Sequence, residues 1–144
     1  MTETLGSLCD KLTIIKLKQF HATDTVKLDS LAQQETLLKD EINQYLQDAF
    51  DGNIPLEKLQ FSANKIYKEE GNETRKIDGD IGIVFAELAK VNCELWHEQE
   101  KVYEFEKVHV TEKDKVVKKL ATLNLERNKC IDTINNRLLL LCQE

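Results

Sequence analysis

Glycine and proline, the residues that most often end a helix, are scarce in this sequence. One proline and five glycines occur in 144 residues, so long stretches contain nothing that interrupts a helical backbone. A chain with so few turn-forming residues cannot supply the many tight turns of a β-sandwich or a β-barrel. The sequence therefore predicts an all-α fold in a chain whose length is typical of a single domain.

Apolar residues recur at intervals of three and four in four stretches, as expected for helices with one buried face. We expect these helices at about 3–21, 26–50 and 81–105, and a fourth that follows a capping sequence at 111–114 and ends near residue 141. Two helical hairpins of this kind predict a four-helix bundle that forms one domain over residues 1–144.

An irregular insertion at about 51–79 separates the two predicted hairpins. Pro55 is suited to start a short helix that runs through Leu59. Residues 60–67 alternate in polarity well enough for a short strand, but a loop fits them equally well. Long connections are often functional or disordered, so the insertion fits a lid, a short strand pair or a disordered segment.

The first and third predicted helices resemble each other when one is laid over the other. Gly6 then aligns with Gly82, and each segment ends in an aromatic residue followed by a histidine, at 20–21 and 96–97. The match fits an internal duplication of one helical hairpin, or a chance likeness between two amphipathic helices.

Charge and cysteine spacing exclude several classes of function. The formal net charge is −6, so the chain lacks the basic excess that nucleic-acid binding requires. No apolar run reaches the length of a membrane span, and no signal peptide is visible at the N-terminus. The spacing of the cysteines matches no zinc or paired-thiol motif. These cysteines are Cys9, Cys93, Cys130 and Cys142. We therefore expect a cytoplasmic protein with reduced thiols, no cofactor and no nucleic-acid partner.

Two charged residues interrupt the apolar stripes of the second predicted hairpin. Glu98 and Arg127 each occupy a position where an aliphatic side chain is expected. Because an isolated charge in a core is costly, we infer that the two meet as an ion pair. With their polar neighbours they form a candidate cluster, which fits either a buried network that fixes helix register or a ligand-binding or catalytic site. The cluster consists of Trp96, His97, Glu98, Asn124, Arg127 and Asn128.

Two further residues are secondary candidates. Glu94 and His97 form an E-x-x-H element, which helical di-iron proteins use in pairs. The first predicted hairpin offers His21 but has Lys18 in place of the glutamate, so we expect no metal centre.

The candidate cluster also carries a resemblance to a known family. Leu-Trp-His-Glu at 95–98, followed one helix later by Leu-Asn-x-x-Arg-Asn-x-x-Ile at 123–131, resembles the motif pair of an uncharacterised bacterial group, domain-of-unknown-function family 4254. The opening at 4–21 resembles Bacteroidetes-type members of that group. The resemblance implies a small soluble bacterial helical protein and names no activity. It also implies, as an alternative, an accessory role in cell-envelope glycosyl transfer.

These observations favour a non-catalytic binding or protein-interaction module that associates with a partner protein or with itself. Four consecutive leucines at 138–141 cover every side of one helical turn, so at least one faces a partner or another segment of the chain. The alternative is an enzyme, or a protein that binds a metal or a small molecule, through the cluster at 96–98 and Arg127.

Overall fold

The computed structural model describes residues 3–61 and 71–144 of the chain. These residues are helical or irregular, and no strand occurs among them. The elements are α1 (Leu5–His21), α2 (Thr25–Phe50), α3 (Leu56–Leu59), α4 (Ile81–Tyr103), the 3₁₀ turn η1 (Phe105–Lys107) and α5 (Lys113–Gln143). The all-α prediction is confirmed, and the four long helices begin and end close to the expected positions. The strand-or-loop prediction for 60–67 falls outside the described residues from residue 62 onward.

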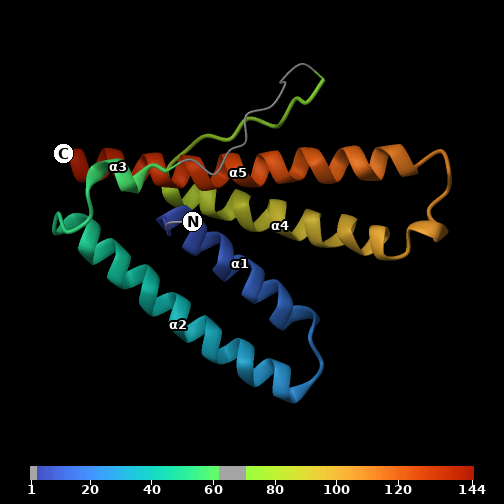
Figure 1. Cartoon of the computed structure of the whole chain (residues 1–144), viewed down its shortest axis with the longest axis horizontal. Coiled ribbons are helices and arrows are strands. Elements are labelled where there is room, and N and C mark those ends of the chain that lie inside the picture. The colour runs from blue at the N-terminus through green and yellow to red at the C-terminus, as the bar shows by residue number, and fades with distance from the viewer. Residues whose placement is uncertain (1–2, 62–70) are drawn as a thin grey trace.

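The four long helices form two antiparallel hairpins (Figure 1). Helices α4 and α5 pack along each other, and α1 lies across both of them, whereas α2 packs chiefly against α1. Only Leu31 and Ala49 of the 26 residues of α2 are buried. Leu28 and Leu38, which the periodicity places on the inner face of α2, are half-buried. The bundle is therefore open on the side of α2.

The core lies where α1 meets the second hairpin. Leu88 and Val91 of α4 and Ile134 and Leu138 of α5 are fully buried there, and Leu5 of α1 is 3 % exposed. Burial of each such side chain contributes about 1.5–3 kcal/mol of hydrophobic free energy. These contacts join α1 to α4 and α5. Most of α2 takes no part in this core.

The start of α1 is fixed against α5 by a close approach of the two backbones. A Cβ atom on Gly6 would collide with the carbonyl oxygen of Ile131 and would lie 2.9 Å from Oδ1 of Asn135. The same Oδ1 accepts a hydrogen bond of 2.7 Å from the backbone N–H of Gly6. Gly82 has no neighbouring atom within 4 Å of the equivalent position. Gly6 and Gly82, which the internal likeness aligns, therefore lie in different environments. Gly6 is in close contact with α5, whereas Gly82 faces open space.

The start of α5 differs from the prediction. The N-cap residue is Glu112 and no side chain caps the helix, so the expected capping sequence at 111–114 is wrong. The hydroxyl of Thr111 instead makes a hydrogen bond of 2.7 Å with Nδ1 of His109. This contact lies within the connection, and the first N–H groups of α5 receive no side-chain cap.

The described end of the insertion, residues 71–80, passes over the outer side of α5 (Figure 1). Lys129 of α5 donates a hydrogen bond of 2.7 Å to the hydroxyl of Thr74. Arg137 donates to the carbonyl oxygen of Gly79 at 2.9 Å and to a carboxylate oxygen of Asp78 at 2.8 Å. This part of the insertion is therefore tied to α5 at several points along the helix.

The four leucines near the C-terminus divide into two pairs. Leu138 and Leu139 are buried in the core, whereas Leu140 and Leu141 are 44 % and 46 % exposed. Two of the four therefore face other segments of the same chain, as expected. None of the helices in the described part of the chain is both long enough and apolar enough to cross a membrane.

Candidate functional site

The inferred ion pair between Glu98 and Arg127 does not form, and that prediction is wrong. Glu98 is 4 % exposed and contacts Nζ of Lys101 at 3.0 Å and Nζ of Lys119 at 3.4 Å. Burial acts to raise the pKa of Glu98, but its hydrogen bonds and charge interactions with the two lysines outweigh burial and lower the pKa. The carboxylate therefore stays ionised, and Lys101 and Lys119 balance its charge near the connection that joins α4 to α5.

The register of the α4–α5 hairpin explains this outcome. Residues equidistant from the connection at 104–112 face each other in an antiparallel pair, which places Glu98 opposite Lys119. Arg127 lies about two helical turns farther along α5, at the level of Asn92. Counting outward from the connection would have found Lys119 as a partner of Glu98, whereas the apolar stripe alone gives no register.

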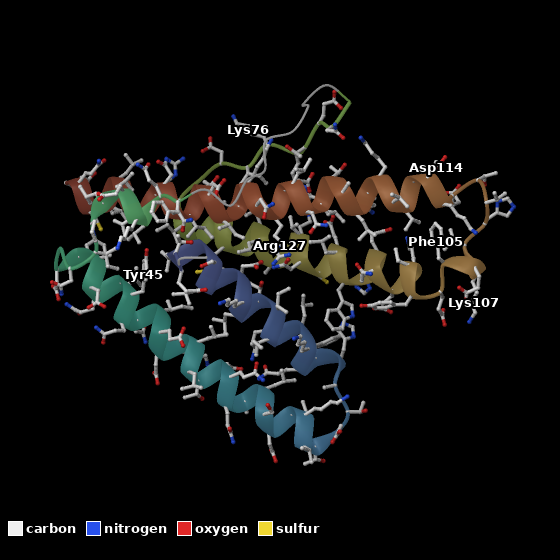
Figure 2. The ribbon with its side chains drawn as sticks, in the orientation of Figure 1. Tyr45, Lys76, Phe105, Lys107, Asp114 and Arg127 are labelled. Atoms are coloured by element: carbon white, nitrogen blue, oxygen red, sulfur yellow. The ribbon has the colours of Figure 1, made fainter. Side chains whose placement is uncertain are left out.

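Arg127 instead binds Asp10 of α1. Its Nε and one terminal nitrogen donate to the two carboxylate oxygens of Asp10 at 2.9 and 2.6 Å. The amide nitrogen of Asn92 donates to Asp10 at 2.9 Å and to the hydroxyl of Thr13 at 2.6 Å. We call these four residues the Asp10 network. Figure 2 shows Arg127 in the middle of the molecule, where α1 meets the second hairpin. The network joins α1, α4 and α5.

The aromatic part of the predicted cluster lies at the far end of α1. The ring of His21 stacks on Trp96, with centroids 4.7 Å apart and planes 6° apart. His97 meets His21 edge-on at 6.4 Å, and its Nδ1 lies 3.9 Å from a carboxylate oxygen of Glu100, with both side chains more than half exposed. The two aromatic–histidine endings noted in the sequence are therefore in direct contact.

The remaining members of the cluster are not brought together with Arg127. Asn124 is exposed on α5 and Asn128 is half-buried, and within residues 3–61 and 71–144 neither is joined to the Asp10 network. Glu94 does not approach His97 but pairs with Arg75 at 2.7 Å. Within the described residues no group of three or more histidine, cysteine, aspartate or glutamate side chains is arranged to hold a metal ion.

Arg75 is the centre of a charged group that the periodicity did not reveal. Its guanidinium contacts Glu87 and Glu94 of α4 at 2.9 and 2.7 Å, and Glu126 of α5 at 2.9 Å. Glu126 also accepts the backbone N–H of Arg75 at 3.1 Å. The hydrogen bonds that Arg75 donates to Glu94 are the largest of the effects that raise the pKa of Arg75 above its ordinary value. The insertion is thus anchored to both helices of the second hairpin.

An open apolar groove of about 620 Å³ lies between α1, α2 and α4. We call it the apolar groove. Its side chains are mostly aliphatic, aromatic or small, with charged groups from Lys16, Glu35 and Lys39. The apolar lining consists of Leu12, Leu17, Phe20, Phe85, Ala89 and Cys93. Phe20 is 83 % exposed, which leaves a large aromatic ring in solvent beside the groove.

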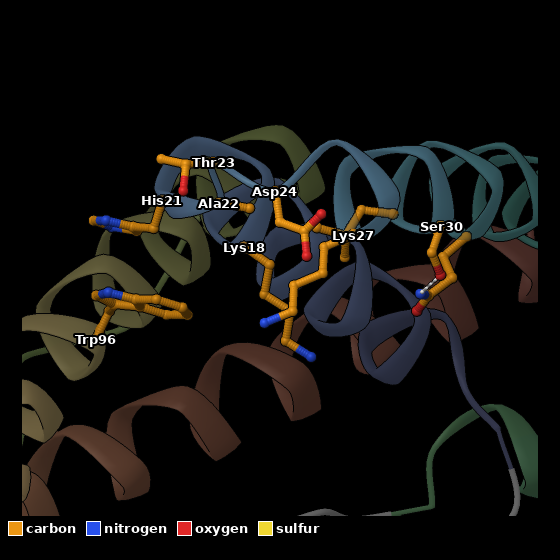
Figure 3. A pocket seen from close by; sticks show the side chains of 10 residues that line it. Lys18, His21, Ala22, Thr23, Asp24, Lys27, Ser30 and Trp96 are labelled. Atoms are coloured by element: carbon orange, nitrogen blue, oxygen red, sulfur yellow. Dashed lines mark hydrogen bonds between the residues drawn. The ribbon is translucent and has the colours of Figure 1, made fainter.

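A second groove, of about 490 Å³, opens on another face of α1. Figure 3 shows it from close by, with the parallel rings of His21 and Trp96 at one side and Lys18, Asp24 and Lys27 in the middle. We call it the lysine groove. It and the apolar groove have no lining residue in common.

No family model, curated protein or solved structure matches this chain. The resemblance to family 4254, the bacterial origin and the cytoplasmic location therefore stay predictions from the residues. What can be said of function rests on the geometry of the described residues.

All four cysteines are free thiols. Burial is the main cause that raises the pKa of Cys9 and of Cys130 to about 12, so these two are protonated and unreactive at neutral pH. Cys93 and Cys142 are partly exposed. Of these two, only Cys93 lines the apolar groove, which makes it a natural reporter of that surface.

Proposed function

We propose that this protein is a non-catalytic interaction module that associates with a second copy of itself through the apolar groove. The observation that carries the proposal is the groove itself, an open apolar surface bordered by the exposed ring of Phe20. Exposed apolar surface of this kind is typical of sites that bind other proteins.

The charged rim of the apolar groove favours an apolar occupant. Glu35 contacts Nζ of Lys16 at 2.9 Å and Nζ of Lys39 at 2.5 Å. Hydrogen bonds from Lys39, Lys16 and Gln19 lower the pKa of Glu35 to about 2. The carboxylate therefore stays ionised and bound to its two lysines, so the rim presents one positive charge in excess rather than a strong field.

A second copy supplies the apolar group that such a groove needs. In a two-fold symmetric pair, each Phe20 contacts the groove of the other copy, and the same patch is used twice. Two acidic chains repel each other through their net charge of −6. The rim of each copy has only one positive charge in excess, so charge at the contact adds little to this repulsion.

The polar clusters give less support to a catalytic role. Glu98 and Arg127, which the alternative places in one site, bind different partners, and each is neutralised by a residue of opposite charge. A general acid or base needs a free group in a cleft with a tuned pKa. Asp10 is instead held by two nitrogen atoms of Arg127 and by the amide of Asn92.

Alkylation of Cys93 at increasing protein concentration tests the proposal. In a Cys142→Ser background, Cys93 is the only partly exposed thiol, because Cys9 and Cys130 are buried. We expect its rate of reaction with iodoacetamide to fall as the second copy covers the groove. The matched control is Cys142 in a Cys93→Ser background, whose rate should not change. A Cys93 rate that is independent of concentration, or a parallel fall at both thiols, would contradict association through the groove.

A further inference from the structure

The lysine groove combines two unpaired cations with an aromatic wall. Lys18 near the end of α1 and Lys27 in the first turns of α2 both line it. Neither ammonium group takes part in an ion pair or hydrogen bond among the described residues. By contrast, each of the other three lysines of α1 and α2 has its Nζ within 2.9 Å of a carboxylate oxygen, and these are Lys11, Lys16 and Lys39. Two ammonium groups directed into one concave surface without an anion are suited to bind one.

The single acidic residue among the ten that line this groove is already engaged. Asp24 is the N-cap of α2, and its Oδ1 accepts a hydrogen bond of 2.9 Å from the backbone N–H of Val26. Its carboxylate therefore serves the start of the helix and forms no ion pair with Lys27. Figure 3 shows the side chains of Lys18 and Lys27 extending in the same direction below Asp24.

The wall of the lysine groove is aromatic and apolar. Trp96 lines it, with one face of the indole covered by the imidazole of His21, and Leu31 contributes a buried aliphatic side chain. This combination resembles the usual make-up of small-molecule sites, in which an apolar wall accompanies a few directed polar groups. The volume of about 490 Å³ also lies within the range of such sites.

We propose that the lysine groove binds a small phosphate monoester that carries an apolar ring. Two ammonium groups favour a dianion over a monoanion, because each adds its own attraction to the second negative charge. The ring would contact Trp96 and Leu31 while the phosphate lies between Lys18 and Lys27. This site is independent of association through the apolar groove, since the two grooves share no residue.

Titration calorimetry with three probes tests the chemistry of the ligand. Phenyl phosphate has both the dianion and the ring, inorganic phosphate has only the dianion, and benzoate has the ring with one negative charge. We expect phenyl phosphate to bind about tenfold more tightly than either of the others, which corresponds to about 1.4 kcal/mol. Equal binding of all three probes, or no heat with phenyl phosphate at millimolar concentration, would overturn the proposal.

The place of binding is tested by fluorescence and by matched variants. Trp96 is the only tryptophan of the chain, so phenyl phosphate bound in the lysine groove should change its emission. Lys18→Gln and Lys27→Gln should each weaken binding about tenfold, because each removes one of the two cations. The control is Lys115→Gln, at an exposed lysine of α5, which should leave the affinity within about twofold. An equal loss in the control, or none in the two groove variants, would place the phosphate elsewhere.

Discussion

Arg127 of α5 holds both carboxylate oxygens of Asp10 of α1, with nitrogen–oxygen distances of 2.9 and 2.6 Å. The pair spans 117 residues of sequence and connects the first hairpin to the second. Asp10 is 5 % exposed, whereas the side chain of Arg127 is 35 % exposed. Asp10, the buried member of the pair, therefore depends on Arg127 to balance its charge, whereas solvent reaches the charge of Arg127.

Removing the cation should destabilise the fold because Asp10 would stay buried without a counter-charge. We expect Arg127→Met to lower the free energy of unfolding by about 3 kcal/mol, at the low end for a broken buried pair because Arg127 is partly exposed. Urea denaturation measures the loss. Arg137→Met is the matched control, since Arg137 pairs with the more exposed Asp78, and it should cost less than about 1 kcal/mol. Equal losses in the two variants would show that the Asp10 network does not join the hairpins.

The two aligned glycines should respond in opposite ways to the same substitution. Gly6→Ala places a methyl group against the backbone of α5, and we expect a loss of about 1–3 kcal/mol as the helices move apart. Gly82→Ala meets open space and should be neutral or stabilise the protein by up to about 1 kcal/mol, because alanine favours the helix. Thermal unfolding of both variants measures the difference. Similar changes in melting temperature would mean that α1 does not approach α5 closely.

Glu98 should make stability depend on pH. Because the pKa of this carboxylate is lowered in the folded protein from its ordinary 4.5, its contribution is present above pH 4.5 and is lost as the pH falls below it. We expect Glu98→Gln to cost about 1–2 kcal/mol at pH 7, and the gap to the wild-type protein to narrow below pH 4.5.

The control for this measurement is Glu100→Gln. Glu100 lies two residues away, and its side chain is 57 % exposed. Its removal should change the free energy of unfolding by less than about 0.5 kcal/mol at any pH. A gap for Glu98→Gln that stays constant from pH 7 to pH 3 would contradict the proposed role of Lys101 and Lys119.

The helices could be predicted from the sequence because their apolar periodicity is long and scarcely interrupted. The open position of α2 could not, since its stripe of leucines is as regular as that of a buried helix. That stripe does not show whether a second layer covers it. Leu28 and Leu38 of that stripe are only half-buried in consequence.

The candidate site was harder to predict. A charged residue in an apolar stripe is expected to be buried, but the stripe does not indicate which residue it pairs with. Glu98 was rightly expected to be buried, yet its partners are lysines from a position that the stripe does not mark. Asp10 gave a weak signal, as one acidic residue on an apolar helix. Arg75 gave none, because it lies in a segment without periodicity and binds carboxylates of two different helices.

Sedimentation equilibrium of the wild-type protein and two variants tests association through the apolar groove most directly. We expect the wild-type chain to form a dimer and Phe20→Asp to be monomeric, because the substitution puts a charge where the second copy packs. Tyr103→Asp changes another highly exposed aromatic residue, at the end of α4, and should remain a dimer. A wild-type protein that stays monomeric at high concentration, or a Phe20→Asp variant that dimerises as strongly as Tyr103→Asp, would contradict the proposal.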